Sequence, residues 1–331
     1  ILPGALVIFT LALAYVTFGQ NPLILKAFMG IKACVVVIVV QALLKISKRA
    51  LFTPMAWAMA ASSFCAISIS VLPFPAVVLV AAIWGTLVLP GAGHPARQMI
   101  KGSHSTATTS ILLAALWAAP FAMLWLFKDV FLTKVAMVFS TLAVVTFGGA
   151  YAVLGYLGQT AVADLHWITA QQMVDSLGLA ETTPGPLILV TQFVGFLAGY
   201  HAGGIGLALL AGLLTLWVTF IPCFLWIFLF APHLERLMAV AWLARGLAGV
   251  TAAVVGVIAS ISIWFAGQIW FAAHASLALG PFNISLPQWH SVDGLAFSLS
   301  AIAAILLIWR KWDILWVLPA MALVSAAISF L

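Results

Sequence analysis

Charged residues are scarce in this sequence. Lys and Arg number 13 and Asp and Glu number 7, so only 6% of the 331 residues are charged, whereas 65% are hydrophobic. The mean hydropathy is +1.24, which excludes an ordinary soluble domain. Apolar runs of about 18 residues recur along the whole chain, and each is long enough to cross a bilayer as a helix. The composition therefore predicts an all-α polytopic membrane protein.

Cysteine and the common catalytic motifs are also scarce or absent. The three cysteines lie in apolar segments without a CxxC spacing, so we expect neither a disulfide framework nor a cysteine metal site. The seven histidines are scattered, with no pair at i, i+4 on a helix, so a zinc site is not expected. No HExxH, GxSxG, P-loop or GxGxxG motif occurs. We therefore expect no enzyme activity, no cofactor and no metal.

The net charge of +6 lies in short polar connections rather than in a basic domain. Such charge carries information about membrane topology, so we expect no nucleic-acid partner. About 11 apolar segments are expected to form membrane helices. Their ranges are 4–19, 28–44, 53–71, 74–90, 109–127, 135–157, 183–200, 204–230, 246–272, 294–309 and 312–331. The two longest polar stretches, 91–108 and 158–182, are expected to be connections.

An internal repeat emerges when the chain is shifted against itself by 219 positions. "ILPGALVIF" falls on "FIPCFLWIF" and "GIKACVVVIV" falls on "GVTAAVVGVI", so that Pro3 matches Pro222 and Gly30 matches Gly249. This pattern predicts a duplication, with residues 1–90 as the remainder of the first repeat. Residues 91–130 form a junction with a linking transmembrane helix, and 131–331 form the second repeat. Because residue 1 matches residue 220, we expect further residues before position 1.

The basic residues indicate that the two repeats are inverted. "KISKR" (45–49) follows the span 28–44, whereas in the second copy Arg236 and Arg245 precede the matching span 246–272. The positive-inside rule then places 45–49, 91–108, 231–245 and 310–311 in the cytoplasm. Inverted repeats with interrupted helices are typical of secondary transporters, whose substrate site lies near the bilayer midplane.

The stretch "ETTPGP" (181–186) interrupts the apolar pattern most clearly. We expect a helix to begin there, with Thr182 or Thr183 as its N-cap and Gly185 in the break. A helix start offers free N–H groups and a positive dipole to an anion. The alternatives are a proline kink and an ordinary helix start at the membrane interface.

A second interruption lies in "VTFGGAYAVLGYLGQ" (145–159). Gly148 and Gly149 break an apolar helix there, and Tyr151 adds a hydroxyl group beside the break. Two broken segments that face one another across a cavity would form a transporter site, and close packing of small residues is the alternative. For the glycines at 195, 199 and 203, spaced by four, we expect packing.

A few polar side chains inside the membrane complete the candidate site. Lys32 would balance the charge of an anion or extend to the interface, and the Gln192 amide would bind the anion. Glu181 and Asp175 are candidates for proton coupling. The alternative for these two carboxylates, as for Asp164 and His166 on the same polar connection, is a solvated loop charge.

Several motifs together resemble the chromate transporter family of the long-chain, two-domain type. They are "FGGAYAVLGYL" (147–157), "HWIT" (166–169), "LGLAETTPGPLILVTQFVGFLAG" (177–199), "WVTFIPCFLWIFLFAPHLERL" (217–237), "LPGAL" (2–6) and "GIKACVVVIVVQALLKI" (30–46). The resemblance implies a multi-pass protein of the bacterial inner membrane that exports chromate and confers chromate resistance. The ion gradient or the membrane potential would power export without ATP. The expected partners are chromate or a similar oxyanion and the lipid bilayer, and a homodimer is left open.

Two other functions stay open at this point. A carrier for another oxyanion such as sulfate would need the same features, since sulfate and chromate share charge and shape. A membrane-embedded enzyme or a non-transporting subunit would instead need an acid–base or metal constellation, and the sequence shows none.

Overall fold

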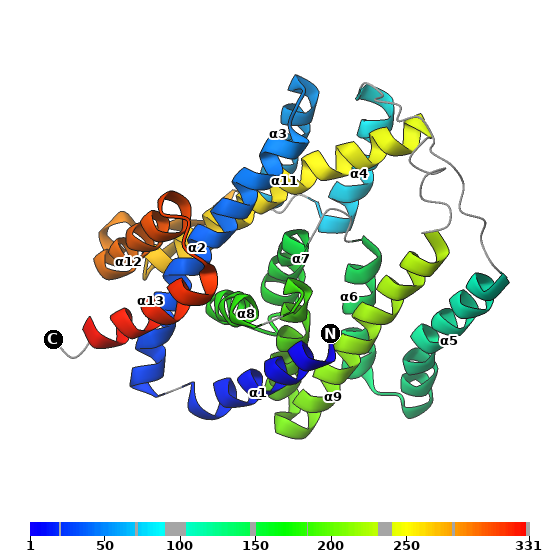
Figure 1. The fold of residues 1–331 in the computed structure, drawn as a ribbon, viewed down its shortest axis with the longest axis horizontal. Helices are drawn as coiled ribbons and strands as arrows, with labels where there is room; N and C mark the ends of the chain where they lie inside the picture. Colours follow the sequence, from blue (N-terminus) through cyan, green and yellow to red (C-terminus); the bar gives the residue numbers. More distant parts are fainter. Residues whose placement is uncertain are drawn as a thin grey trace.

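The chain is an all-α polytopic membrane protein (Figure 1). In the computed structural model, the described residues are 1–19, 21–69, 72–89, 104–145, 150–183, 185–230, 240–279 and 282–328. Four described helices, Pro22–Ala50, Thr108–Phe127, Leu187–Phe230 and Ala241–Trp270, have the length and apolar composition to cross a membrane. Shorter apolar helices pack around them.

The helices and strands fall into three consecutive groups along the chain. The first group holds α1 (Leu2–Phe18), α2 (Pro22–Ala50), α3 (Pro54–Ser68), α4 (Phe74–Val88) and α5 (His104–Phe127). The middle holds α6 (Val130–Val145), α7 (Ala150–Leu157), the π-helix η1 (Gly158–Asp164), α8 (Ala170–Thr182), the 3-10 turn η2 (Leu187–Leu189) and α9 (Val190–Phe230). The last part holds α11 (Ala241–Trp270), β1 (His274–Leu279), β2 (Phe282–Pro287), η4 (Trp289–Ser291), α12 (Gly294–Ala304), η5 (Ile305–Trp309) and α13 (Ile314–Ile328).

Proline and a polar cap set several helix starts. Pro22 and Pro54 stand in the first turns of α2 and α3, where a missing backbone N–H costs no hydrogen bond. Asn21 and Thr53 precede them, and each side chain accepts a hydrogen bond from the first turn. These short signals explain why helices begin directly after brief connections.

Helix α9 is two helical segments joined at Gly203 and Gly204, whose dihedral angles are not helical. Gly204 has a φ of 76°, a left-handed conformation that glycine adopts without strain. The segments fold back on one another, because a Cβ on Gly199 would meet Ala208 and Ala211. Gly195 and Gly199 thus serve close packing, as predicted, whereas Gly203 belongs to the joint. The spans 183–200 and 204–230 lie in separate segments.

The contacts of α2 are repeated by α11. Helix α2 packs against α12 and α13, and α11 packs against α3 and α4. A Cβ on Gly30 would strike the Met321 carbonyl, and a Cβ on Gly249 would strike the Ala81 carbonyl. Gly30 and Gly249 are the glycines that the shift of 219 positions aligns. In Figure 1, α2 rises from the lower left, whereas α11 descends from the upper right, so these two helices run in opposite directions.

A two-stranded antiparallel hairpin, β1–β2, is a feature that the sequence analysis did not predict. It lies in the connection 271–293 between α11 and α12, whereas only 51–53 connect α2 to α3. The hairpin is therefore an addition to the second set of helices, and it does not alter the all-α class.

The structure corrects one predicted segment and describes another only in part. In the span 135–157, α6 runs to Val145 and α7 begins at Ala150, and the predicted break at 148–149 lies outside the residues that the structure describes. The predicted connection 158–182 is largely structured, since it contains η1 and α8. Thr169 and Gln172 form a capping box that starts α8 within this polar sequence. The polar composition of this stretch is the reason that the buried helix α8 was not predicted.

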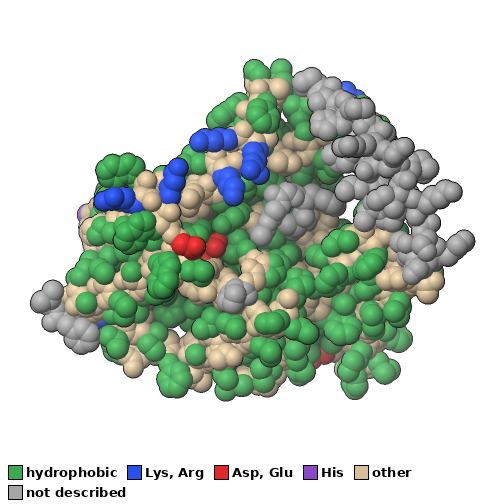
Figure 2. Space-filling view, viewed as in Figure 1, with side chains coloured by type: hydrophobic (Ala, Val, Ile, Leu, Met, Phe, Trp, Pro, Cys, Tyr) green, Lys and Arg blue, Asp and Glu red, His purple; other side chains and the backbone are tan. Residues whose placement is uncertain are grey.

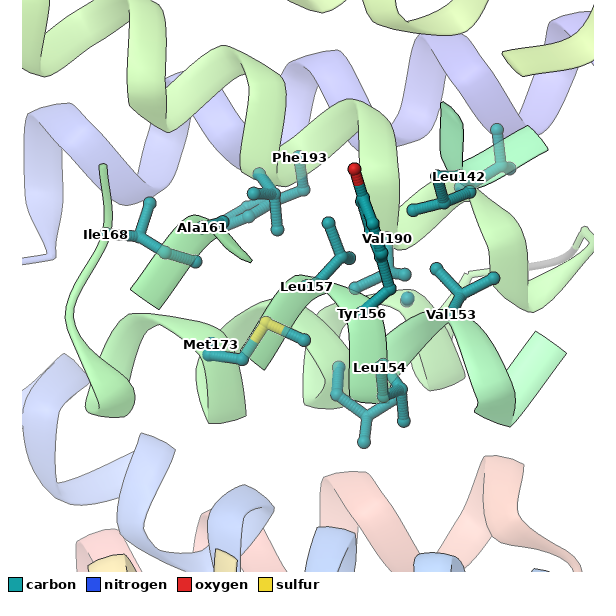
Figure 3. Close-up of a cluster of buried hydrophobic side chains, with 14 of the residues drawn as sticks. Leu142, Val153, Leu154, Tyr156, Leu157, Ala161, Ile168, Met173, Val190 and Phe193 are labelled. Atoms are coloured by element: carbon teal, nitrogen blue, oxygen red, sulfur yellow. The ribbon is translucent and has the colours of Figure 1, made fainter. Parts of the chain in front are cut away.

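The largest hydrophobic cluster surrounds α7 (Figure 3). Side chains from α6, α7, η1, α8 and α9 meet there, among them Leu142, Leu157, Met173 and Phe193, none of which is exposed by more than 1%. The outer surface is also apolar, and Figure 2 shows hydrophobic side chains over most of one face. Apolar side chains on both sides of a helix are expected where the outer side faces lipid.

Candidate functional site

The break after α8 lies at the centre of the candidate site, but its threonines do not start a helix. Thr182 is the last residue of α8 and Thr183 is its C-cap. Their hydroxyl groups donate to the Leu179 carbonyl at 2.7 and 2.8 Å. The predicted N-cap role is therefore wrong, because α8 extends to this point and both hydroxyls bond back into it. The next helical turn, η2, begins after Pro186 without a side-chain cap.

The starts of α1 and α9 meet at this break. The backbone of Gly185, with a φ of 158°, is so close to α1 that a Cβ there would lie 3.8 Å from the Gly4 Cα atom. In the first turn of α9, the Gln192 Nε2 group donates to the Ala5 carbonyl at 3.0 Å. Pro3 stands in the first turn of α1, where proline is well tolerated. Two helix N-termini thus converge beside an amide side chain.

Gln192 is fully buried, and its Oε1 atom has no hydrogen-bond partner among the described residues. Thr215 and Thr219, one turn apart on the second segment of α9, are also fully buried, and their hydroxyl oxygens have no partner in the part of the chain that the structure describes. The Thr215 side chain lies against Gly195, one turn beyond Gln192. Buried polar groups without partners are uncommon in folded proteins and mark candidate functional positions.

Tyr151 connects the second predicted interruption to the first. Its hydroxyl group, near the start of α7, donates to the Glu181 Oε1 atom near the end of α8 at 2.9 Å. The two interrupted segments are thus in direct contact, whereas the sequence analysis expected them to face one another across a cavity. Gly148 and Gly149 lie outside the described residues, as does Pro184. We call Tyr151, Glu181, Gly185 and Gln192, with the starts of α1 and α9, the helix-start cluster.

Lys32 and Asp175 form an ion pair. The Lys32 Nζ atom lies 3.2 Å from the Asp175 Oδ1 atom, in an ionic contact rather than an aligned hydrogen bond. Tyr15 donates to the other carboxylate oxygen, Oδ2, at 2.8 Å. Lys32 also donates to the Gln171 Oε1 atom at 3.2 Å. We call Lys32, Asp175, Tyr15 and Gln171 the Lys32 cluster.

Asp175 and Glu181 are not solvated loop charges. Both belong to α8, and Asp175 is only 4% exposed. A buried carboxylate is tolerated where a cation and hydrogen bonds compensate it, as Lys32 and Tyr15 do here. The Tyr15 ring also packs against the Phe193 ring with 5.4 Å between centroids. Because Phe193 follows Gln192 in α9, this contact connects the Lys32 cluster to the helix-start cluster.

The sequence analysis missed four residues that the structure brings into these clusters: Tyr15, Gln171, Thr215 and Thr219. A tyrosine hydroxyl group inside an apolar helix and two threonines spaced by four were the available signals. Among the described residues, no group of three His, Cys, Asp or Glu side chains could hold a metal ion.

Comparison with known proteins identifies the family. The chromate transporter family model matches residues 1–86 and 133–327, which is most of the chain. The chain belongs to the chromate transporter family. No solved structure gives a significant match.

Curated relatives in this family are transport proteins by name. The chromate transport protein of Pseudomonas aeruginosa is 32% identical over 79% of this chain and 61% of its own length. The chromate transport protein of Cupriavidus metallidurans is 26% identical over 78% of the chain and 60% of its own length. A probable chromate transport protein of Synechococcus elongatus is also 26% identical, over 78% of the chain and 62% of its own length. The chain therefore spans about three fifths of the relatives it matches.

Proposed function

We propose that the chain carries chromate, or a similar tetrahedral divalent oxyanion, across the inner membrane of a bacterium as a secondary transporter. The observation that carries the proposal is the meeting of the α1 and α9 starts at Gly4, Gly185 and Gln192. Membership of the chromate transporter family and the names of the relatives support the substrate class.

The helix-start cluster has the chemistry that an oxyanion needs. The first N–H groups of a helix lack partners within it, and the helix dipole places partial positive charge at that end. Two such ends would attract an anion without a permanent positive charge that would hold it too tightly. Gln192 would add a side-chain N–H group, and Gly185 allows close approach of the backbone. Gly148, Gly149, Tyr151, Thr182 and Thr183 stay in this proposed substrate site.

The membrane potential favours export. A potential of about 100 mV, negative inside, contributes about 2.3 kcal/mol for each negative charge that moves outward. A dianion would therefore be expelled with about twice that driving force, without ATP. Outward movement would lower cytoplasmic chromate and give chromate resistance. Proton coupling through Glu181 or Asp175 is compatible with this scheme, and Lys32 supplies a counter-charge near the pathway.

The proposed architecture is an inverted repeat. Residues 1–90 belong to the first copy, 91–130 to the junction and 131–331 to the second copy. The repeated contacts of α2 and α11 support this division, as do their opposite chain directions. Figure 2 shows Lys and Arg side chains gathered over the region of α2, whose last turn holds Lys48 and Arg49. By the positive-inside rule this end faces the cytoplasm. Assembly as a homodimer is part of the proposal.

Uptake of labelled chromate into everted membrane vesicles tests the function. Energised everted vesicles are positive inside, so we expect uptake that depends on the potential and resists excess sulfate. Uptake abolished by sulfate would instead identify a general oxyanion carrier, the second candidate. If no uptake occurred, the transport proposal would fail. The remaining possibility, an enzyme or a non-transporting subunit, would then be tested by measuring catalytic turnover in detergent without a gradient.

A further inference from the structure

A cavity of about 330 Å³ opens beside the Lys32 cluster. Lys32 from α2, Gln171 from α8 and Gln268 from α11 lie on its wall, and His274 and Asp293 come from the two ends of the hairpin connection. The cavity is much larger than the roughly 30 Å³ that a water molecule occupies in the liquid, so a small hydrated ion fits. Part of its wall belongs to the connection 271–293, which has no counterpart of similar length after α2.

The polar side chains of this cavity are one ammonium group, one carboxylate, two amides and a histidine. Lys32 contributes an ammonium group, and the His274 Nε2 atom is buried without a hydrogen-bond partner among the described residues. The Asp293 carboxylate is engaged in capping α12, because its Oδ1 atom accepts from the backbone N–H groups of Leu295 and Ala296. The Gln171 amide bridges the cavity wall by donating to the Gln268 carbonyl at 2.7 Å.

Asp175 lies behind Lys32 and is almost excluded from solvent, whereas the Lys32 side chain is 19% exposed. Its two oxygens face different partners, Lys32 on the cavity side and Tyr15 on the other. An anion that enters the cavity therefore meets the Lys32 ammonium group, which is paired with the Asp175 carboxylate of α8. Tyr15 would retain its hydrogen bond to that carboxylate after the cation turned away.

We propose that this cavity is a second anion site, a vestibule for a small tetrahedral oxyanion that competes with Asp175 for the Lys32 ammonium group. Asp175 acts as a built-in substitute anion that holds Lys32 when the vestibule is empty and lowers its affinity for external anions. His274 is a further donor to the bound anion. The identity of the anion rests on the proposed transport of oxyanions, but the competition itself depends only on the ion pair.

Calorimetric titration of the purified protein in nanodiscs with sodium chromate, and separately with sodium sulfate, tests this vestibule. The variant Lys32→Gln should lose one class of anion sites, whereas Asp175→Asn, which frees Lys32 of its competitor, should tighten that class several-fold. The double variant Lys32→Gln/Asp175→Asn removes both charges of the pair and should fold normally without the site. Lys26→Gln removes a positive charge from the same end of α2, outside the cavity, and should leave binding unchanged.

Asp175→Asn gives the sharpest result, because loss of a purely structural ion pair would not tighten anion binding. If Asp175→Asn bound anions no more tightly than the unmodified protein, or if the double variant kept every site, the vestibule would be refuted. Gln192→Leu separates this proposal from the transport site. Binding that responds to Lys32 and Asp175 but not to Gln192 supports the vestibule and contradicts the helix-start site. The reverse pattern supports the transport site and contradicts the vestibule.

Discussion

At the residue scale, single glycines determine how closely the two segments of α9 approach. A Cβ on Gly195 would meet the Thr215 side chain, whereas a Cβ on Gly206 would find no atom within 4 Å. The same substitution to alanine should therefore have opposite consequences at two positions of one helix.

We expect Gly195→Ala to lower the free energy of unfolding by about 1–3 kcal/mol, because the added methyl group overpacks the contact. Gly206→Ala should be neutral or slightly stabilising, since alanine favours the helix. Denaturant unfolding in detergent compares the two variants. Equal effects at both positions would show that the segments of α9 do not pack against one another at Gly195.

Helix α7 contains the half-buried Tyr151 and the buried Tyr156, whose hydroxyl groups have different partners. Tyr151 donates to Glu181 in the helix-start cluster, and Tyr156 donates to the Val138 carbonyl at 3.1 Å. Phenylalanine at either position removes one hydrogen bond, which contributes about 0.5–1.5 kcal/mol to stability.

Because only Tyr151 belongs to the proposed site, Tyr151→Phe should reduce chromate flux several-fold beyond its effect on stability. Tyr156→Phe should cost similar stability and leave flux near the unmodified level. Flux in proteoliposomes, normalised to folded protein, makes the comparison. A similar loss of flux in both variants would argue that Tyr151 has only a structural role.

At the element scale, α2 and α11 each pack with short helices that belong to the other half of the sequence. Helix α3 contacts α11 through Ser68 and Ser260, whose hydroxyl oxygens are 2.9 Å apart. Helix α13 contacts α2 where the Ser325 hydroxyl group donates to the Lys26 carbonyl at 2.7 Å. These two contacts can be tested by cross-linking.

In a background without the three native cysteines, the pairs Ser68→Cys/Ser260→Cys and Lys26→Cys/Ser325→Cys should form disulfides with a membrane-permeable oxidant. The mismatched pair Ser68→Cys/Ser325→Cys provides the control and should remain reduced. Mass spectrometry of proteolytic fragments reports the bonds. Efficient oxidation of the mismatched pair, or no oxidation of the matched pairs, would contradict the packing of α3 against α11 and of α13 against α2.

The sequence predicted the elements that apolar length defines and missed those that tertiary contacts define. Long helices such as α2 and α11 follow from their hydrophobic runs, and the glycine packing in α9 follows from its spacing. Helix α8 was missed because its polar residues find partners across the fold, such as Lys32 for Asp175. The role of Thr183 depended on where the preceding helix ends, which local composition does not determine. Pairings such as Tyr15 with Asp175 join residues far apart in the chain, which a single sequence does not reveal.

At the scale of the whole molecule, the proposed inverted arrangement predicts the side of the membrane that each end of a long helix faces. The last turn of α2 carries Lys48 and Arg49, and Arg245 lies near the start of α11. The hairpin follows the other end of α11. The two ends of α11 should therefore face opposite compartments.

Single cysteines at Lys48 and at Ala275, both exposed, report this topology. A membrane-impermeant maleimide should label Lys48→Cys only in everted vesicles and Ala275→Cys only in intact spheroplasts. Labelling of both positions from the same side would contradict the inverted topology.

The central claim is that an oxyanion passes the meeting point of the α1 and α9 starts. The most direct measurement is labelled chromate uptake into proteoliposomes under a potassium diffusion potential that is positive inside, with Gln192→Leu as the comparison. We predict uptake that rises with the potential in the unmodified protein and is largely lost in folded Gln192→Leu. Absence of potential-driven uptake in the unmodified protein, or undiminished uptake by Gln192→Leu, would contradict it.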